Sequence, residues 1–203
     1  MLLSRVELRR QPVTFTFVMP VLTVNLKRHF TALGLLVLLS GMATAQDRTA
    51  ELLESLRSAG PVDAPRIVRD IEREWSKSGS AAMDMLLTRG REAMEEGDFV
   101  LAIEHLTALT DHAPDFAEGY HARAEAFFRR DLYGPALDDL ERTLSLNPQH
   151  FDAIFGLAVL MQEFGDLRRA ATLYRKVLEL HPHHENAKTA LDRLKRDGIG
   201  REI

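Results

Sequence analysis

The chain has 203 residues and no cysteine, and its 26 Lys and Arg side chains against 30 Asp and Glu side chains give a formal net charge of −4 at pH 7. A chain without cysteine has no disulfides, no c-type haem attachment and no lipid anchor on an N-terminal cysteine. The acidic balance argues against nucleic acid as a partner, because phosphate binding needs clustered Lys and Arg.

The first 45 residues have the features of a secretory signal peptide. A positively charged flank precedes an uncharged, leucine-rich run over residues 30–45 that ends in Ala-Thr-Ala, and this pattern predicts cleavage after Ala45. The alternative is an uncleaved membrane anchor, but the strongly apolar centre, residues 32–39, is shorter than the about 20 residues that span a bilayer. Residues 1–18 fit neither role, and a start at Met19 would give a signal of ordinary length.

Export would make the remaining chain more acidic. Residues 1–45 carry five basic side chains and one acidic side chain, so the other 158 residues carry 21 basic and 29 acidic side chains, a formal charge of −8. The sequence therefore predicts a protein of the bacterial periplasm that meets a membrane only through its signal segment before cleavage.

Residues 46–82 are predicted to form a pair of helices. Apolar residues recur at helical spacing from residue 52 to 56 and again at Ile67, Ile71 and Trp75, and a Gly-Pro pair separates the two stretches. The pair is interpreted either as a degenerate repeat unit or as a dedicated N-terminal cap.

Residues 83–184 repeat with a fixed period. Pro114, Pro148 and Pro182 stand 34 residues apart, and a period of this length is typical of a chain that stacks one supersecondary unit. Three further columns are in register with the prolines: Gly90, Ala124 and Ala158; Ala102, Ala136 and Ala170; and Leu106, Leu140 and Tyr174.

The physics of one unit explains these columns. Two apolar helical stretches flank a short turn, where Gly97 and Gly165 suit a left-handed helix end and Asp131 takes the same place in the second unit. The small residues let the two helices approach closely, and each proline ends the second helix. The sequence therefore predicts an all-α fold of antiparallel helix pairs.

This pattern resembles that of the tetratricopeptide repeat family, with a small residue in the first helix, alanine in the second and proline near the end. The resemblance covers three units, 83–116, 117–150 and 151–184, and implies a right-handed superhelical stack of antiparallel helix pairs. The chain departs from the family pattern at Arg89 and Arg123, where leucine is expected.

The last segment, residues 185–203, is predicted to be a capping helix and tail. A narrow apolar stripe there is surrounded by basic side chains and ends at Gly198. Such a helix would cover the open end of the stack.

Stacked helix pairs leave an inner face lined by the first helix of each unit, and this face is the predicted partner-binding groove. The helical period and the predicted core positions together indicate which side chains face inward. These residues are Leu87, Arg91, Glu118, His121, Glu125, Phe128, Asp152, Phe155, Val159 and Gln162. A peptide with apolar and basic side chains would suit this lining. In the alternatives, Phe155 and Val159 pack beneath the C-terminal helix or against a second copy of the chain, and the acidic residues form a solvated face.

A second candidate site is a histidine cluster that would bind zinc or copper if its members converged. Its members are His150, His181, His183 and His184. The alternative is that these histidines cap the ends of helices. The sequence contains no phosphate-binding loop, nucleophile elbow or metalloprotease motif, so it predicts neither an enzyme nor a bound cofactor.

The sequence therefore predicts a non-enzymatic scaffold or adaptor that binds a protein or peptide partner through the inner face of its repeats. The alternative function is a small histidine-based metal-binding or metal-delivery protein. One subgroup of the family clamps a C-terminal carboxylate with Lys and Asn side chains. At the corresponding positions here only Arg91 is cationic, so the resemblance does not predict that ligand.

Overall fold

The structure is a computed structural model that describes residues 48–199. The predicted signal peptide, residues 1–45, lies outside the described residues. Among residues 48–199, no helix has the length and apolar content needed to cross a membrane.

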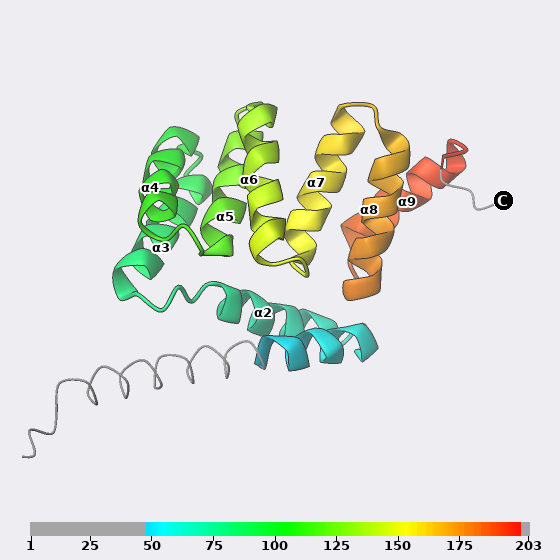
Figure 1. Cartoon of the computed structure of the whole chain (residues 1–203). Coiled ribbons are helices and arrows are strands. Elements are labelled where there is room, and N and C mark those ends of the chain that lie inside the picture. The colour runs from blue at the N-terminus through cyan, green and yellow to red at the C-terminus, as the bar shows by residue number, and fades with distance from the viewer. Residues whose placement is uncertain (1–47, 200–203) are drawn as a thin grey trace, which may run out of the picture. The chain divides into compact units, whose positions relative to one another are not determined.

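All regular elements of the described chain are helices (Figure 1). Residues 48–58 form a first helical segment. It is followed by α2 (Ala64–Trp75), α3 (Ala81–Glu95), α4 (Phe99–His112), α5 (Ala117–Phe128), α6 (Tyr133–Leu146), α7 (Phe151–Glu163), α8 (Leu167–Leu180) and α9 (Glu185–Arg196). Helix α3 packs on α4, α5 on α6 and α7 on α8, and α4 meets α5 and α6 meets α7. The predicted all-α stack of helix pairs is confirmed.

The first helix of each repeat unit is followed by a residue in the left-handed backbone conformation, as predicted from the glycines at these positions. Gly97 and Gly165 have φ of 78° and 81°, and Asp131 has φ of 58° at the equivalent place in the second unit. In all three turns the next residue donates its backbone N–H to a carbonyl five residues earlier, as in a Schellman motif. The carboxylate of Asp131 also accepts a hydrogen bond of 2.9 Å from the hydroxyl of Tyr133.

Close packing between α3 and α4 explains why the first unit has glycine, the smallest residue, at position 90. A Cβ atom on Gly90 would lie 2.6 Å from Cγ and Cδ2 of Leu106 on the partner helix, closer than packed carbon atoms approach. Both residues are buried. The contact therefore sets the distance between α3 and α4.

Replacing Gly90 with alanine should lower the free energy of unfolding by about 1–2 kcal/mol, because the added methyl group overpacks the contact with Leu106. Helix propensity alone would instead raise the free energy of unfolding by about 1 kcal/mol, because alanine favours the helix over glycine. Urea unfolding followed by circular dichroism separates the two, and a more stable variant would contradict the close approach.

An ion pair explains one departure from the family pattern. Arg123 donates to both carboxylate oxygens of Asp139 on α6, over 2.7 and 2.8 Å, and to the hydroxyl of Thr110 on α4 over 2.7 Å. Asp139 and Thr110 are buried. Arg123 therefore ties three helices together where the family has leucine, whereas Arg89 is exposed.

The N-terminal helix pair packs against the third repeat unit, crosswise beneath the repeat helices in Figure 1. Its apolar residues Leu56, Ile67 and Ile71 share one hydrophobic cluster with Phe151 at the start of α7. The ring of His183 donates a 3.0 Å hydrogen bond to the carbonyl of residue 59, 124 positions earlier in the chain. The pair therefore forms a wall alongside the repeat helices.

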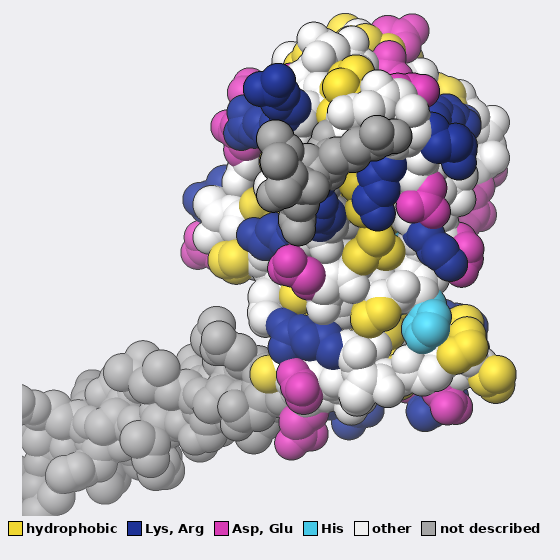
Figure 2. Space-filling view, turned by 90° about the vertical axis from the view of Figure 1, so that its right-hand side faces the viewer, with side chains coloured by type: hydrophobic (Ala, Val, Ile, Leu, Met, Phe, Trp, Pro, Cys, Tyr) yellow, Lys and Arg dark blue, Asp and Glu magenta, His cyan; other side chains and the backbone are white. Residues whose placement is uncertain are grey.

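Helix α9 ends the stack as a solvated helix. It packs on α8 through the buried side chains of Ala187, Leu191 and Leu194. Figure 2 faces this end of the molecule, where Lys and Arg side chains are interspersed with Asp and Glu, and hydrophobic side chains form small separate groups.

Candidate partner-binding groove

A cavity of about 790 Å³ lies between α2 and the first helices of the three units. Helix α2 and the residue that follows it contribute Arg69, Glu72, Arg73, Trp75 and Ser76. The repeats contribute Arg91, Glu118, His121, Ala124, Glu125, Phe128, Leu140, His150, Asp152, Phe155, Gly156 and Val159. We call this cavity the groove.

Eight of the ten side chains predicted from the sequence lie in the groove lining: Arg91, Glu118, His121, Glu125, Phe128, Asp152, Phe155 and Val159. Leu87 does not, because it is only 2 % exposed and packs in the core of the first unit; its assignment to the groove is wrong. Gln162 lies outside the lining, where its side-chain oxygen accepts a 3.3 Å hydrogen bond from the hydroxyl of Tyr174.

The contribution of α2 to the groove was not predicted. Arg69, Glu72, Arg73 and Ser76 recur at spacings of three and four, so they form one polar face of the helix. That periodicity is visible in the sequence. The sequence does not say which repeat unit the helix packs against, because the contacts that place it join residues far apart in the chain.

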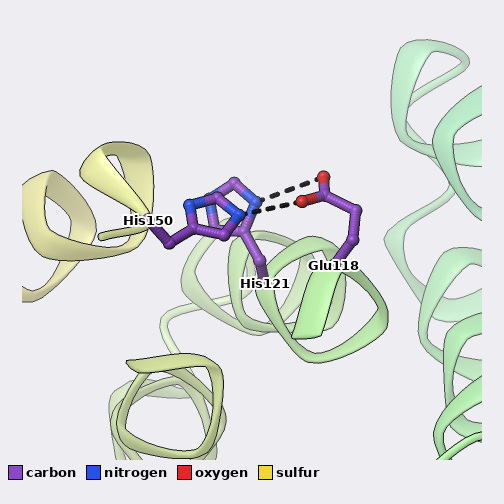
Figure 3. A group of neighbouring side chains, drawn as sticks. All are labelled: Glu118, His121 and His150. Atoms are coloured by element: carbon purple, nitrogen blue, oxygen red, sulfur yellow. Dashed lines mark hydrogen bonds and ion pairs between the residues drawn. The ribbon is translucent and has the colours of Figure 1, made fainter. Parts of the chain in front are cut away.

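The buried carboxylate of Glu118 is the centre of the polar contacts in the groove (Figure 3). One oxygen accepts a hydrogen bond from Arg91, and the other accepts one of 2.8 Å from Nε2 of His150. Nδ1 of His121 lies 3.5 Å from the first oxygen, at ion-pair distance. Glu118 therefore joins α3, α5 and the start of α7.

Two contacts connect this centre to the N-terminal helix pair. Trp75 stacks on the ring of His150, with ring centroids 4.2 Å apart and planes inclined by 25°. Arg91 donates a second hydrogen bond, of 2.9 Å, to the hydroxyl of Ser76 directly after α2. We call Trp75, Arg91, Glu118, His121 and His150 the junction cluster.

The charge states of the junction cluster follow from its contacts. Burial alone would raise the pKa of Glu118, but the hydrogen bond from His150 and the close approach of His121 outweigh it and hold the pKa far below its usual range. Burial would lower the pKa of His121, but the carboxylate of Glu118 raises it. Burial and the neighbouring charge of His121 lower the pKa of His150 to about 4. Near neutral pH the cluster therefore contains an ionised Glu118 and a neutral His150.

Lowering the pH from 7 to about 4.5 should loosen the contact between α2 and the repeats. The pKa of His150 lies below its ordinary 6.5, so its contribution to stability is complete above about pH 6.5 and is lost as the pH falls toward 4. His121 acts in the opposite sense, because its raised pKa gives stability in acid that is lost as the pH rises through that value. The raised pKa values of Asp152 and Glu72 act in the same sense as that of His121, so we expect a local loosening at His150 rather than a large change in the global free energy of unfolding.

Trp75 is the only tryptophan in the chain, so its fluorescence reports this transition directly. Its emission should shift to the red between pH 6.5 and 4 as it leaves the ring of His150. The variant His150→Asn, which keeps a side-chain acceptor at the start of α7, should show a weaker pH dependence. An unchanged profile in that variant would assign the transition to another group.

The structure does not bring the four predicted metal-ligand histidines together. His150 lies in the junction cluster, His183 bonds the carbonyl of residue 59, and Nδ1 of His184 accepts the amide of Ala187 at the start of α9. In the described part of the chain, only Glu118, His121 and His150 place potential ligand atoms within 4.8 Å of one another. The structure therefore does not assemble the predicted set, because His150 is the N-cap of α7 and bonds Glu118, whereas His181, His183 and His184 lie in the turn between α8 and α9.

The hydrogen bonds of the junction cluster favour an ion-pair network over a metal centre. Nδ1 of His150 accepts the amide N–H of Ala153 over 3.3 Å, so the ring hydrogen is on Nε2 and is donated to Glu118. A metal ion at Nε2 would displace that hydrogen and would also compete with Arg91 for the carboxylate.

Sequence and structure comparisons agree on the family of the repeats. Profiles of the tetratricopeptide repeat match residues 87–151 and 128–194. A TPR repeat-containing protein of Rhizobium etli is 28 % identical over 75 % of this chain and 75 % of its own length. Sperm-associated antigen 1 of Mus musculus is 31 % identical over 54 % of this chain but only 12 % of its own length.

Among solved structures, the first TPR domain of Spaghetti (RPAP3), bound to an HSP90 peptide, is similar in fold. It aligns with a TM-score of 0.56 and 24 % identity over 58 % of this chain and 94 % of that domain. The 34-residue period, the stacked helix pairs and the matching profiles together place this chain in the tetratricopeptide repeat family.

Proposed function

We propose that this protein is a non-enzymatic scaffold, exported to the bacterial periplasm, that binds a partner protein or peptide in the groove. Tetratricopeptide repeat proteins act as scaffolds for protein–protein interaction, and the similar domain of Spaghetti was solved with a bound peptide. Export is supported by the apolar run and Ala-Thr-Ala ending before residue 46.

The observation that carries the proposal is the groove itself. Its volume of about 790 Å³ lies within the usual range for ligand pockets, about 300–1,000 Å³. Its lining mixes aromatic and aliphatic side chains with charged ones, which is the composition of a recognition surface. Phe155 touches the rings of Tyr174 and His184 on one side and faces the groove on the other.

Site-specific crosslinking in living cells tests the proposal. The full chain, expressed with its own signal segment, carries p-benzoylphenylalanine at Val159 in the groove or, as a matched control, at Val100. Val100 is 50 % exposed on α4 and does not line the groove. We expect adducts with a partner protein from position 159 and none from position 100. Equal adducts from both positions, or adducts from position 100 alone, would place the binding surface elsewhere.

The same cells test export. Cell fractionation should recover the protein in the periplasm, and N-terminal sequencing should start at Gln46. Retention in the cytoplasm with an intact N-terminus would overturn the proposed location and leave the groove assignment to the crosslinking result.

A further inference from the structure

The groove contains three carboxylates that form no ion pair with Lys or Arg in the described part of the chain: Glu72, Glu125 and Asp152. Among residues 48–199, no Lys or Arg nitrogen lies within ion-pair distance of any of them. Nε2 of His184 lies 3.9 Å from Asp152, but burial lowers the pKa of His184 and favours its neutral form. Glu118 differs, because Arg91 and His150 bind both of its oxygens.

Two arginines of α2 also line the groove, but they do not balance these acids. Arg73 forms a 2.9 Å ion pair with Asp70, which lies outside the groove lining. Arg69 is exposed on the helix surface, where its charge and that of Arg91 oppose the rise in the pKa of Glu72 without forming an ion pair with it.

His121, whose pKa is raised by Glu118, Asp152 and Glu125, offsets part of the negative charge of these acids. Asp152 and Glu125 together still carry more negative charge than this one histidine balances.

The titration of the groove acids supports this excess. Burial raises the pKa of Asp152 to about 6, and the charges of Glu72, Glu118 and Glu125 add to it while His121 opposes it. Burial and the charge of Glu118 also raise the pKa of Glu72. A cation entering the groove would relieve this repulsion, as an opposite charge favours the ionised carboxylate.

Apolar surface lies beside the acids in the same groove. Phe128, Phe155 and Val159 are partly exposed and line the cavity. A long basic side chain suits such a site, because its aliphatic stem packs on apolar surface while its charged end reaches the carboxylates. Aromatic rings also attract cations placed over their faces.

We infer that the groove binds a peptide segment through a Lys or Arg side chain, whose cationic end lies among Glu72, Glu125 and Asp152. The stem of that side chain and an adjacent apolar residue pack on Phe128, Phe155 and Val159. This inference rests on the proposed function, since it names the chemistry of the partner that the groove receives. It adds that removing one positive charge from the partner weakens binding by at least about tenfold.

Fluorescence polarisation with three matched peptides tests the inference. Each is a labelled decapeptide with leucine and phenylalanine beside a central residue, which is arginine, its uncharged analogue citrulline, or glutamate. We expect the arginine peptide to bind at least about tenfold more tightly than the citrulline peptide, and the glutamate peptide to bind most weakly. Raising the salt concentration should weaken only the arginine peptide.

Two double variants locate the effect. Glu125→Gln with Asp152→Asn should reduce the preference for arginine over citrulline to less than about twofold. Asp138→Asn with Glu141→Gln removes the same charge from exposed positions on α6 and should leave the preference unchanged. Below pH 6 the preference should shrink in the wild-type protein, because Asp152 becomes protonated, and at still lower pH His184 gains charge.

Three outcomes would overturn the inference. They are equal binding of the arginine and citrulline peptides, an unchanged preference in the Glu125/Asp152 variant, and no binding of any peptide at about 1 mM. Crosslinked adducts from position 159 would persist in each case if the groove binds a partner of other chemistry. Failure of the inference is thereby distinguished from failure of the proposed function.

Discussion

Replacing Glu118 with glutamine should lower the free energy of unfolding by about 3 kcal/mol at pH 7. The carboxylate is buried and serves Arg91, His121 and His150 at once. Glutamine has the same shape but no charge, so Arg91 and His121 would lose their counter-ion. Removing one partner of a buried ion pair leaves the other charge uncompensated, which is the costly case.

Urea unfolding followed by the fluorescence of Trp75 and by circular dichroism measures this loss. The matched control is Glu125→Gln, seven residues further along the same helix, because Glu125 is exposed and unpaired in the described residues. It should change the free energy of unfolding by less than about 0.5 kcal/mol. In the Glu118 variant the pKa of His121 should also fall toward or below its ordinary value, since Glu118 is what raises it. Equal effects of the two substitutions would contradict the central role of Glu118.

Replacing Asp139 with leucine should cost about 3 kcal/mol, because Arg123 would keep its charge in a half-buried site without a partner. Replacing Arg123 and Asp139 together with leucine should recover most of that loss and bring stability to within about 1 kcal/mol of the wild-type protein. Buried pairs often cost as much to desolvate as they return in attraction.

A double-mutant cycle with Arg123→Leu, Asp139→Leu and the combined variant gives the coupling energy between the two side chains. We expect a coupling of at least about 2 kcal/mol, with the losses of the single variants far from additive. Additive losses would show that the two residues act independently, and would contradict the bidentate geometry.

The repeat architecture was predictable because its determinants lie close together in the sequence. Pro114 and its equivalents end helices locally, and Gly97 or Asp131 reverses the chain locally. The small residues recur with the same 34-residue period as these helix-ending residues. The pattern of one unit therefore predicts the helices of the next. The contact of Gly90 with Leu106 shows that the columns also set how closely the helices approach.

The groove was only partly predictable, since one of its walls comes from outside the repeats. Asp152, Phe155 and Val159, which helical phase assigned to the inner face, line the cavity. The same assignment failed at Leu87, because the phase that lines the groove in α5 and α7 directs this side chain into the core of the first unit. Trp75 reaches His150 across 75 residues of chain, and no local pattern encodes a contact of that length.

The junction cluster connects the fold to its proposed function. The N-terminal helix pair contributes Glu72 and Trp75 to the groove, so the groove has this wall only while the pair is docked. Contacts through Ser76 and His150 hold it there. Loss of the cluster should therefore weaken partner binding as well as stability, even though Glu118 itself is buried.

Hydrogen–deuterium exchange of the protein, with and without the partner recovered by crosslinking at residue 159, tests most directly whether the groove is the binding surface. We expect slower exchange in α2, α5 and α7, which line the groove together, and little change in α4 and α8 on the other side of the helix pairs. Slower exchange confined to α4, α6 and α8, with α2 unaffected, would contradict the account.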